Sequence, residues 1–463
     1  MSRTAFHDGR VVLHGGDCLE VLDGLAAESV DSVVTDPPYH LLSTVKRFGK
    51  TSKADDTTTS ERARTCSDGM ARMSRGFMGK EWDGGDIAFR VETWAKVFRV
   101  LKPGGHVVAF SAPKCSHRMV CAIEDAGFEI RDGLMWMFGT GFPKSHDVSK
   151  GIDRAAGAVR EKVAVGAPVR RMVPGADQDA TGSWIKDDGR EYQPGIELPA
   201  SDAAREWEGW GTALKPAYEP ICLARKPLGE KTVAANVLAH GVGGLNIDGC
   251  KVGEGARRAT ATAGISRKSS PVYGDFAETE DEAFVTTKGR WPANVCHDGS
   301  AEVVAAFPSV GDSHPPCNEG IIRKNTVLGR DLRPRDFHPG FADSGSAARF
   351  FYSAKADAGD RIGSKHPTVK PVDLMRWLCR LVTPPGGTIL DLFAGTGTTG
   401  EAALLENFSA ILIEREAEYR ADIARRMAHV FDGAASRKVA IAKAKGADAH
   451  ENLPLFGNNE AAE

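Results

Sequence analysis

The stretch ILDLFAGTGTTG at residues 389–400 decides the fold. Its apolar first part is typical of a buried strand, and the glycines that follow predict a tight turn leading into a helix. Gly395, Gly397 and Gly400 fit the pattern G-x-G-x-x-G in this strand-turn-helix context. Because glycine has no Cβ, a ligand can approach the backbone closely at the carboxyl end of such a strand. The stretch therefore predicts an α/β fold with a ligand site at this turn.

Two acids lie at informative positions around the turn. Glu414 ends the next expected strand, near the spacing of about 20 residues at which nucleotide-binding folds place an acid for the ribose. Asp391 lies inside the strand end before the glycines, where a dinucleotide-binding turn needs no acid. An adenosine-containing cofactor explains strand, helix and acid together better than a purely structural turn does.

Outward from this stretch, strand and helix patterns alternate. We expect strands at 11–13, 31–35, 106–110, 134–138, 217–224, 388–393 and 410–413, and helices at 19–25, 87–101, 117–126, 372–382, 398–406 and 417–430. Residues 103–105 (Pro-Gly-Gly) are expected to end the helix before them. This alternation predicts a parallel sheet, with 217–224 lying antiparallel to 134–138 at the end of the sheet.

A second motif, TDPPY at residues 35–39, follows one of the expected strands. Two successive prolines end a strand whatever its function, because neither can donate to a sheet ladder. The motif also falls at the carboxyl end of that strand, on the crevice side of an α/β sheet. The Asp36 carboxylate and the Pro37 carbonyl can accept the two N–H bonds of an exocyclic base amine, and Tyr39 offers a face for stacking an extruded base.

Taken together, the two motifs resemble those of the amino-methylating DNA methyltransferases, which act on adenine N6 or cytosine N4. Their order, with TDPPY first, resembles the β class found in bacteria and phages. Segments GDCL at 16–19, HPTVKP at 366–371 and GTALKPAYEP at 211–220 are also similar to segments of this family. The resemblance covers roughly residues 11–140, 209–228 and 364–430.

The resemblance implies an α/β, circularly permuted, Rossmann-like, S-adenosylmethionine-dependent methyltransferase fold with an inserted target-recognition region. It assigns the catalytic role to Asp36, Pro37, Pro38 and Tyr39. It assigns S-adenosylmethionine binding to eight residues: Asp17, Lys370, Asp391, Phe393, Gly395, Gly397, Thr398 and Glu414. Glu414 would hold the ribose. No metal is expected, because a zinc site drawn from Cys296, His297, His314 and Cys317 has loose spacing.

The implied organisation has four parts. They are 1–228, the catalytic half with an irregular insert at about 141–211; 229–350, the candidate target-recognition insertion; 351–432, the cofactor-binding half; and 433–463, a disordered tail. Periodicity is weak in the insert and in 229–350, which is too long for a plain loop.

Charge is unevenly distributed along the chain. The net charge of −3 does not indicate a nucleic-acid binder, but residues 41–80 hold nine Lys and Arg against four acids. With TDPPY directly before it, this segment is expected to contact DNA phosphates. The candidates for DNA contact in this segment and in the Arg-rich stretch near 330 are Lys46, Arg47, Lys50, Arg323 and Lys324.

Several alternatives stay open. By the same resemblance, Asp before Pro-Pro-Tyr favours adenine N6, and cytosine N4 remains the alternative. A methyltransferase of RNA or of protein glutamine is another alternative, of which the glutamine enzymes conflict with the motif order. A nicotinamide-dependent oxidoreductase would leave TDPPY unexplained. A catalytically inactive DNA-binding subunit of a restriction complex is the alternative from another class.

The expected setting is the cytoplasm of a bacterium, or of the host of a phage. The 463 residues contain no apolar stretch of about 20 and begin without a secretory signal. Nine cysteines without a C-x-x-C pair indicate a reducing compartment. Double-stranded DNA is the expected partner, optionally with a restriction endonuclease, and the chain is expected to be a monomer or homodimer without membrane contact.

Overall fold

The computed structural model describes most of the chain. The described residues are 2–39, 86–141, 145–166, 169–170, 191–253, 257–259, 284–286, 289–310, 345–354, 359–364, 366 and 368–433, with 436–437, 439 and 441. They fall into two compact units, residues 1–139 with 218–463 and residues 140–217. Most of the predicted tail, 433–463, lies outside the described residues.

The first unit is built on a 10-stranded sheet of order β1-β2-β18-β17-β3-β4-β10-β5-β13-β16. The strands are β1 Ser2–Phe6, β2 Val11–Gly15, β3 Val30–Thr35, β4 Leu101–Phe110, β5 Glu129–Met137, β10 Tyr218–Arg225, β13 Val295–His297, β16 Tyr352–Ser353, β17 Thr388–Asp391 and β18 Ser409–Glu414. Neighbouring strands from β2 to β4 are parallel, and β10 is antiparallel to both β4 and β5. The predicted α/β class is confirmed.

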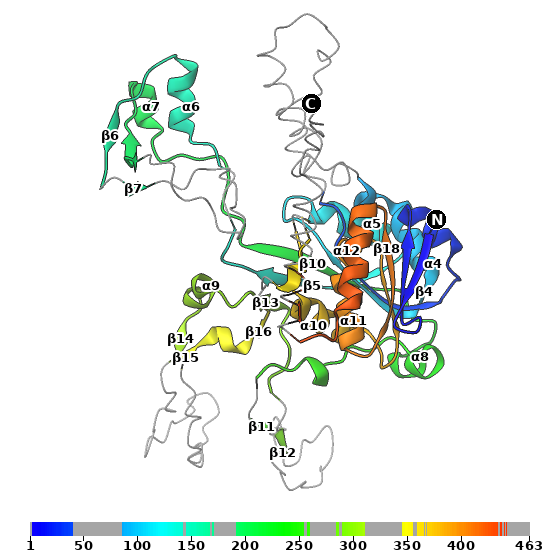
Figure 1. The fold of residues 1–463 in the computed structure, drawn as a ribbon. Coiled ribbons are helices and arrows are strands. Elements are labelled where there is room, and N and C mark those ends of the chain that lie inside the picture. The colour runs from blue at the N-terminus through cyan, green and yellow to red at the C-terminus, as the bar shows by residue number, and fades with distance from the viewer. Residues whose placement is uncertain are drawn as a thin grey trace, which may run out of the picture. The chain divides into compact units, whose positions relative to one another are not determined.

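Helices cover both faces of this sheet (Figure 1). One face packs on α1 Cys18–Gly24, α4 Val91–Val100 and α5 Ser116–Asp125, and the other on α10 Val372–Val382, α11 Thr398–Leu405 and α12 Ala417–Ala428. Successive residues of a strand point to opposite faces, so Val33 joins the core on the α4 side and Val34 the core on the α10 side. Strands buried on both faces explain the continuous apolar runs in the sequence.

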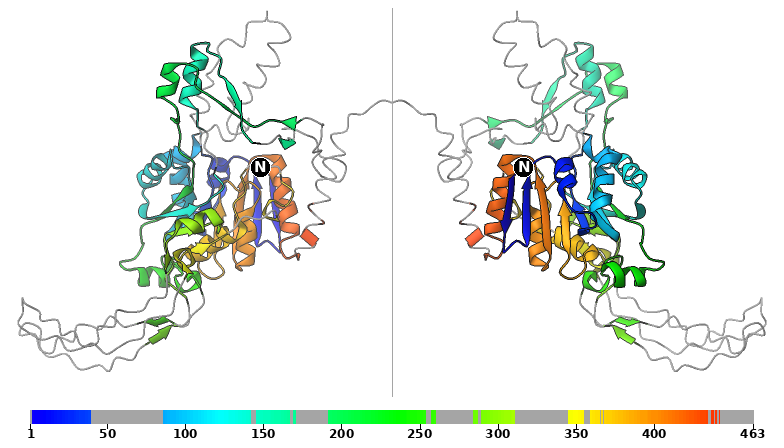
Figure 2. Two further views of the ribbon diagram at one scale, coloured as in Figure 1. Left: turned by 90° about the vertical axis from the view of Figure 1, so that its left-hand side faces the viewer. Right: turned by 90° about the vertical axis from the view of Figure 1, so that its right-hand side faces the viewer.

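The direction of winding reverses between β17 and β3. From β17 the chain passes through α11 to β18 on one side, whereas from β3 it passes through α4 to β4 on the other. Figures 1 and 2 accordingly show orange C-terminal strands beside blue N-terminal ones. In an open α/β sheet, the crevice for a ligand lies at the carboxyl ends of the two strands where this reversal occurs.

Two predicted boundaries near β4 are wrong. The helix expected over 87–101 is divided into a 3-10 helix, Ile87–Phe89, and α4, because Arg90 adopts an extended conformation. Residues 103–105, which were expected to end the helix, lie within β4. The pairing of β3 with β4 shifts register between Val30 and Ser32, so the additional β4 residues are accommodated in an irregularity of the ladder.

The edges of the sheet also differ from expectation. β10 is antiparallel to β5 as predicted but lies inside the sheet, because β13 and β16 extend it beyond β5. Both short strands come from or adjoin the segment without clear periodicity. At the opposite edge, β1 was not predicted; it forms a hairpin with β2 through a turn in which His7 and Asp8 have positive φ.

The second unit contains α6 Val148–Ala155, α7 Asp202–Glu206, β6 Lys162–Ala164, β7 Val169–Arg170, β8 Glu191–Tyr192 and β9 Gly195–Glu197. The buried Asp153 carboxylate holds it together by accepting from Arg160 and from the backbone of Ala200 and Ser201. These bonds hold the pKa of Asp153 below its usual range.

The remaining elements belong to the first unit. They are α8 Val233–His240, α9 Ala301–Ala306, β11 Arg257–Ala259, β12 Phe284–Thr286, β14 Ser309–Val310, β15 Gly345–Ser346 and the 3-10 helices Asp248–Cys250, Ala347–Phe350 and Gly359–Arg361. Within the part of the chain that is described, no helix has the length and apolar character needed to cross a membrane.

Candidate active site

A cavity of about 480 Å³ opens at the carboxyl ends of β17 and β3. We call one side the β3 wall; it comprises residues 36–39 after β3, Glu219 at the start of β10, and Lys370. We call the other side the β17 wall; it comprises residues 391–399 after β17, and Glu414 at the end of β18. Both walls belong to the first unit.

Lys370 is the centre of the β3 wall. Its Nζ lies 2.8 Å from Asp36 Oδ2 and 3.1 Å from Glu219 Oε2, and it donates to the Tyr39 hydroxyl at 3.0 Å. The residue is only 7% exposed. Burial by itself would lower the pKa of Lys370, but the two carboxylates outweigh it and raise that pKa. The ammonium is therefore charged throughout the physiological range.

Asp36 offers its other oxygen to the cavity. Oδ1 is buried and has no hydrogen-bond partner among the residues that the structure describes, while Oδ2 is paired with Lys370. Buried carboxylate oxygens are normally satisfied. An acceptor left open beside a cavity fits a ligand that brings its own N–H or O–H donor.

Tyr39 is anchored at both ends. Its backbone carbonyl accepts from the Cys115 thiol at 3.2 Å, and its hydroxyl accepts from Lys370. Burial, together with the nearby Asp36 and Glu219 carboxylates, raises the pKa of Tyr39 well above its usual value. The side chain is therefore a neutral phenol whose ring is held beside the Asp36 carboxylate.

The β17 wall is shaped by glycine backbone. Gly395 and Gly397 have φ of +51° and +78°, in the left-handed region that side chains disfavour. A Cβ on Gly397 would lie 3.0 Å from Ile423, and one on Gly395 would lie 3.5 Å from the His366 ring. Gly397 does not line the cavity itself but starts α11, so it sets the path of the turn.

The Asp391 side chain supports this turn through hydrogen bonds. Its carboxylate accepts from the hydroxyls of Thr35 at 2.7 Å and Thr399 at 2.5 Å, and from the backbone of Phe393 at 3.1 Å. The residue is 3% exposed, and burial raises the pKa of Asp391 to about 6. The side chain thus ties the end of β3 to the start of α11.

Glu414 faces the turn from β18. One carboxylate oxygen accepts from the backbone of Gly395 and the other from that of Glu416, both at 2.8 Å. Burial raises the pKa of Glu414 to about 7. Each oxygen keeps a second lone pair, so the carboxylate can also accept from the hydroxyls of a bound ribose.

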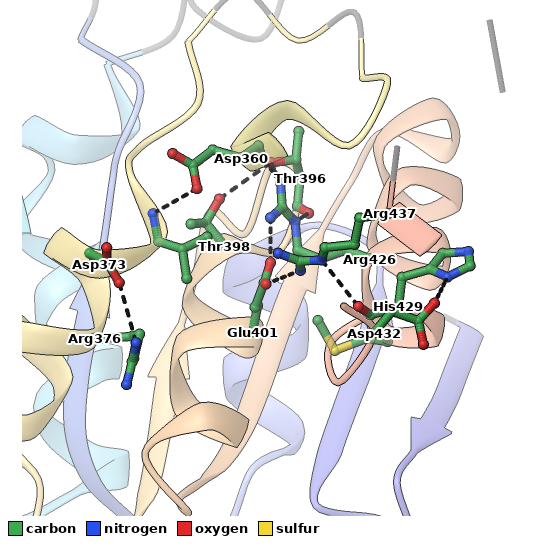
Figure 3. Close-up of polar contacts among 12 residues, drawn as sticks. Asp360, Asp373, Arg376, Thr396, Thr398, Glu401, Arg426, His429, Asp432 and Arg437 are labelled. Carbon is green, nitrogen blue, oxygen red and sulfur yellow. Dashed lines mark hydrogen bonds and ion pairs between the residues drawn. The ribbon is translucent and has the colours of Figure 1, made fainter. Parts of the chain in front are cut away.

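Arg426 of α12 braces the same turn (Figure 3). It is fully buried, pairs with Glu401 of α11 at 2.6 Å, and donates to the Thr396 carbonyl at 2.7 Å and the Asp360 carbonyl at 2.5 Å. Arg437 contacts the second oxygen of Glu401. A buried charge network therefore fixes the backbone one residue before Gly397.

The structure brings most predicted site residues to this one cavity. Those that line it are Asp17, Asp36, Pro37, Pro38, Tyr39, Lys370, Asp391, Phe393, Gly395, Thr398 and Glu414. Asp17 also caps α1 by accepting from Leu19. The predicted DNA contacts, Lys46, Arg47, Lys50, Arg323 and Lys324, lie outside the described residues, so they stay predictions.

Other residues of the site escaped prediction. Glu219 lies in the segment GTALKPAYEP, and its position could have been inferred from the antiparallel direction of β10, which starts where its parallel neighbours end. His366, whose ring packs on Tyr419 at 4.5 Å, lies next to Gly395. Nothing in the sequence indicated that Arg426 belongs to the site, because a basic residue on an amphipathic helix is normally exposed to solvent.

Comparisons with known proteins point in one direction. Residues 266–425, which include the β17 wall, match the sequence model of the DNA methylase family that groups N6 and N4 enzymes. The type II methyltransferase M.HindIII of Haemophilus influenzae is 24% identical over 249 residues, covering 50% of this chain. The match spans 64% of M.HindIII, less than two thirds of that relative.

Among solved structures, the chain is similar to PvuII DNA methyltransferase (cytosine-N4-specific), with a TM-score of 0.37 and 13% identity over 94% of this chain and 93% of the other. It is also similar to M1.HpyAVI in complex with SAM, with a TM-score of 0.34 and 14% identity over 90% of this chain and 98% of the other. Both similarities are distant.

Proposed function

We propose that the chain transfers a methyl group from S-adenosylmethionine to an exocyclic base amine in DNA, in keeping with the match of residues 266–425 to the DNA methylase family model. One observation carries the proposal. The motif TDPPY and the Gly-rich turn come from opposite ends of the chain, yet they line one cavity where the sheet reverses its winding.

The β17 wall suits the adenosine and methionine parts of the cofactor. The cavity volume of about 480 Å³ is that of a small-molecule site. Glu414 would accept from the ribose hydroxyls, and the backbone at Gly395 allows close approach of the ligand. When bound, S-adenosylmethionine supplies a methyl group activated by the positive charge on sulfur.

The β3 wall suits the amine. Asp36 Oδ1 would accept one N–H, and the Pro37 carbonyl would accept the other, which draws the nitrogen towards a tetrahedral form and frees its lone pair for attack. The nitrogen would take the methyl group from the sulfonium, which would leave as a neutral thioether. One amine proton then leaves to Asp36 or to solvent. A base inside a duplex cannot reach this wall, so the base is flipped out and stacks on Tyr39.

Adenine N6 is the proposed target, because the acid before Pro-Pro-Tyr is Asp36. Cytosine N4 is the alternative, since it presents the same amine with two hydrogens. Residues 229–350 are proposed to recognise the sequence of double-stranded DNA, with phosphate contacts from the basic segment 41–80. The proposed place of action is the bacterial cytoplasm, as a monomer or homodimer, with a restriction endonuclease as an optional partner.

Mass spectrometry of digested nucleosides tests the proposal. Plasmid DNA is incubated with S-adenosylmethionine and with wild-type protein, Asp36→Ala, or the control Glu124→Gln, which changes an exposed residue of α5. We expect N6-methyladenine from the wild type and the control, and none from Asp36→Ala, while calorimetry shows that Asp36→Ala still binds the cofactor.

Each other outcome has a meaning. N4-methylcytosine would keep the mechanism and overturn the choice of adenine. Cofactor binding without a modified base in any DNA would favour an RNA or protein substrate or an inactive subunit. Absence of cofactor binding by the wild type would contradict the methyltransferase itself.

A further inference from the structure

The β3 wall contains one charged group more than the proposed reaction uses. Asp36 accepts the amine and Lys370 neutralises it, but Glu219 has no part in that scheme. We propose that Glu219 is a positioning residue that acts through Lys370, holding the ammonium between two carboxylates so that the Oδ1 of Asp36 stays open to the amine. This inference rests on the proposed function.

The geometry places Glu219 for this role. It comes from β10, the antiparallel strand, whose first residues lie beside the ends of β4 and β5. Its carboxylate lines the cavity, and its side chain is 19% exposed. The Lys370 ammonium lies between Asp36 and Glu219, within 3.1 Å of both.

The carboxylate of Glu219 contacts two side chains of the β3 wall. Its buried Oε2 has no hydrogen bond among the described residues and lies 3.1 Å from the Lys370 ammonium, and the carboxylate also lies beside the Tyr39 hydroxyl. Asp391, by contrast, accepts from the Phe393 backbone and from the hydroxyls of Thr35 and Thr399, and so ties separate elements of the fold together.

Two carboxylates and one ammonium give the wall a net charge of −1. With Asp36 alone, Lys370 would form a closed neutral pair and would compete with the amine for both carboxylate oxygens. Glu219 shares the ammonium, so Asp36 keeps one oxygen free. The remaining negative charge lies on the wall that would hold the amine, where it would stabilise positive charge developing on the nitrogen.

Among the described residues, six ionisable groups lie in or interact with this cluster. β3 and the turn after it supply Asp36 and Tyr39, β10 supplies Glu219, and β17 supplies Asp391. The segment before α10 supplies His366 and Lys370. Lys370 is the one group of this set that carries positive charge at neutral pH, because burial lowers the pKa of His366. Removing Lys370 therefore leaves unbalanced carboxylates.

Four proteins test the inference: wild type, Glu219→Gln, Lys370→Met and the double variant. The first measurement is thermal stability against pH for the cofactor-free proteins, which needs no activity. In Lys370→Met, Asp36 and Glu219 face each other without the ammonium, so their two negative charges repel each other in the folded protein and not in the unfolded chain. This repulsion grows as the carboxyl groups lose their protons, so the Tm of Lys370→Met should fall from pH 5 to 8 more steeply than that of the wild type. In the double variant, that additional fall should disappear.

The second measurement is methylation at pH 7. We expect Glu219→Gln to lower kcat by on the order of tenfold, with the KM for S-adenosylmethionine unchanged because Glu219 faces the amine side. Lys370→Met should lose more. The double variant should be more active than Lys370→Met, because Asp36 is again the single carboxylate and stays ionised.

The outcomes separate the inference from the proposed function. Equal kcat for wild type and Glu219→Gln, or the same pH dependence of Tm in Lys370→Met and the double variant, would overturn the role of Glu219 and leave the methyltransferase intact. If the wild type modifies no DNA, the function fails, and the Tm curves alone decide whether Glu219 and Asp36 are coupled through Lys370.

Discussion

On the β3 wall the charged side chains gather around the cavity, whereas on the β17 wall they are used to hold the backbone. Asp36 and Glu219 meet at the Lys370 ammonium, and Asp36 keeps an oxygen open to the ligand. On the opposite wall, Asp391 binds two hydroxyls and a backbone amide, and Arg426 binds two carbonyls. The surface offered to the ligand there is largely the turn itself.

The two walls should therefore respond differently to substitutions. A wall made of charges should lose turnover when a charge is removed, even if the shape is kept. A wall made mainly of backbone should lose cofactor affinity or stability when its supports or its left-handed residues are replaced, although those residues present no charge to the ligand. The variants below test that division.

The largest effect is expected for Arg426→Met. The substitution keeps most of the apolar volume but leaves the buried Glu401 with Arg437 as its remaining charged partner, and breaking a buried pair costs up to about 3–5 kcal/mol. Urea unfolding should show this loss, accompanied by weaker binding of S-adenosylmethionine. The neighbouring Arg425→Met removes a partly exposed pair with Asp422 and should cost about 0–1 kcal/mol. A stable Arg426→Met protein with normal cofactor affinity would contradict the view that buried charges support the backbone of the β17 wall.

Gly397→Ala should come next. A left-handed residue other than glycine costs about 1–2 kcal/mol, and the new methyl group would lie 3.0 Å from Ile423, so the turn must shift. We expect calorimetry to show cofactor affinity reduced by roughly tenfold or more. Gly386→Ala has a similar φ of +72° but open space around the new methyl group and lies off the cavity. If Gly386→Ala weakens the cofactor equally, strain alone explains the effect.

On the β3 wall, Tyr39→Ala should weaken productive DNA binding by about 1–3 kcal/mol, the value of base stacking on an aromatic ring. Tyr39→Phe keeps the ring and loses the hydrogen bond from Lys370, so its effect should be smaller. The KM for DNA and the affinity for S-adenosylmethionine are measured in parallel. A loss of cofactor affinity in Tyr39→Ala would show that the two walls are not separable.

The smallest effect is a pH dependence of cofactor binding. Since the pKa of Glu414 is raised to about 7, its carboxylate is largely protonated at pH 6 and largely ionised at pH 8. Only the ionised form accepts from both ribose hydroxyls, so the affinity should rise with pH across this range, by at most roughly tenfold. Calorimetry at pH 6, 7 and 8 measures it. Glu414→Gln should bind more weakly and show no such rise, and a parallel rise in that variant would assign the titration to another group.

The sequence predicted well what local patterns specify. The strand before TDPPY and the strand and turn around Gly395 each contain an apolar run that ends at a glycine or proline. Because the carboxyl ends of neighbouring parallel strands share one edge, the meeting of the two motifs followed once both strands were recognised.

The sequence predicted poorly what depends on contacts between distant segments. Nothing near Lys370 indicates that its partner is Glu219, because that pairing arises from β10 running antiparallel between β4 and β5. Arg426 is buried only because α11 presents Glu401 to it. β13 and β16 are three and two residues long, too short to carry a periodic signal.

In the centre of the sheet, strands from the start of the chain alternate with strands from its C-terminal part, which affects how the protein folds during synthesis. β2 and β3 emerge early, but their partners β18 and β17 come from residues 388–414. Until those residues arrive, both early strands have an unpaired edge, which is a template for pairing with other chains. Pairings so distant in sequence also slow folding. For most of synthesis, β2 and β3 are therefore not joined through the strands that lie between them. The β3 wall and the β17 wall face each other only after β17 and β18 have added to the sheet.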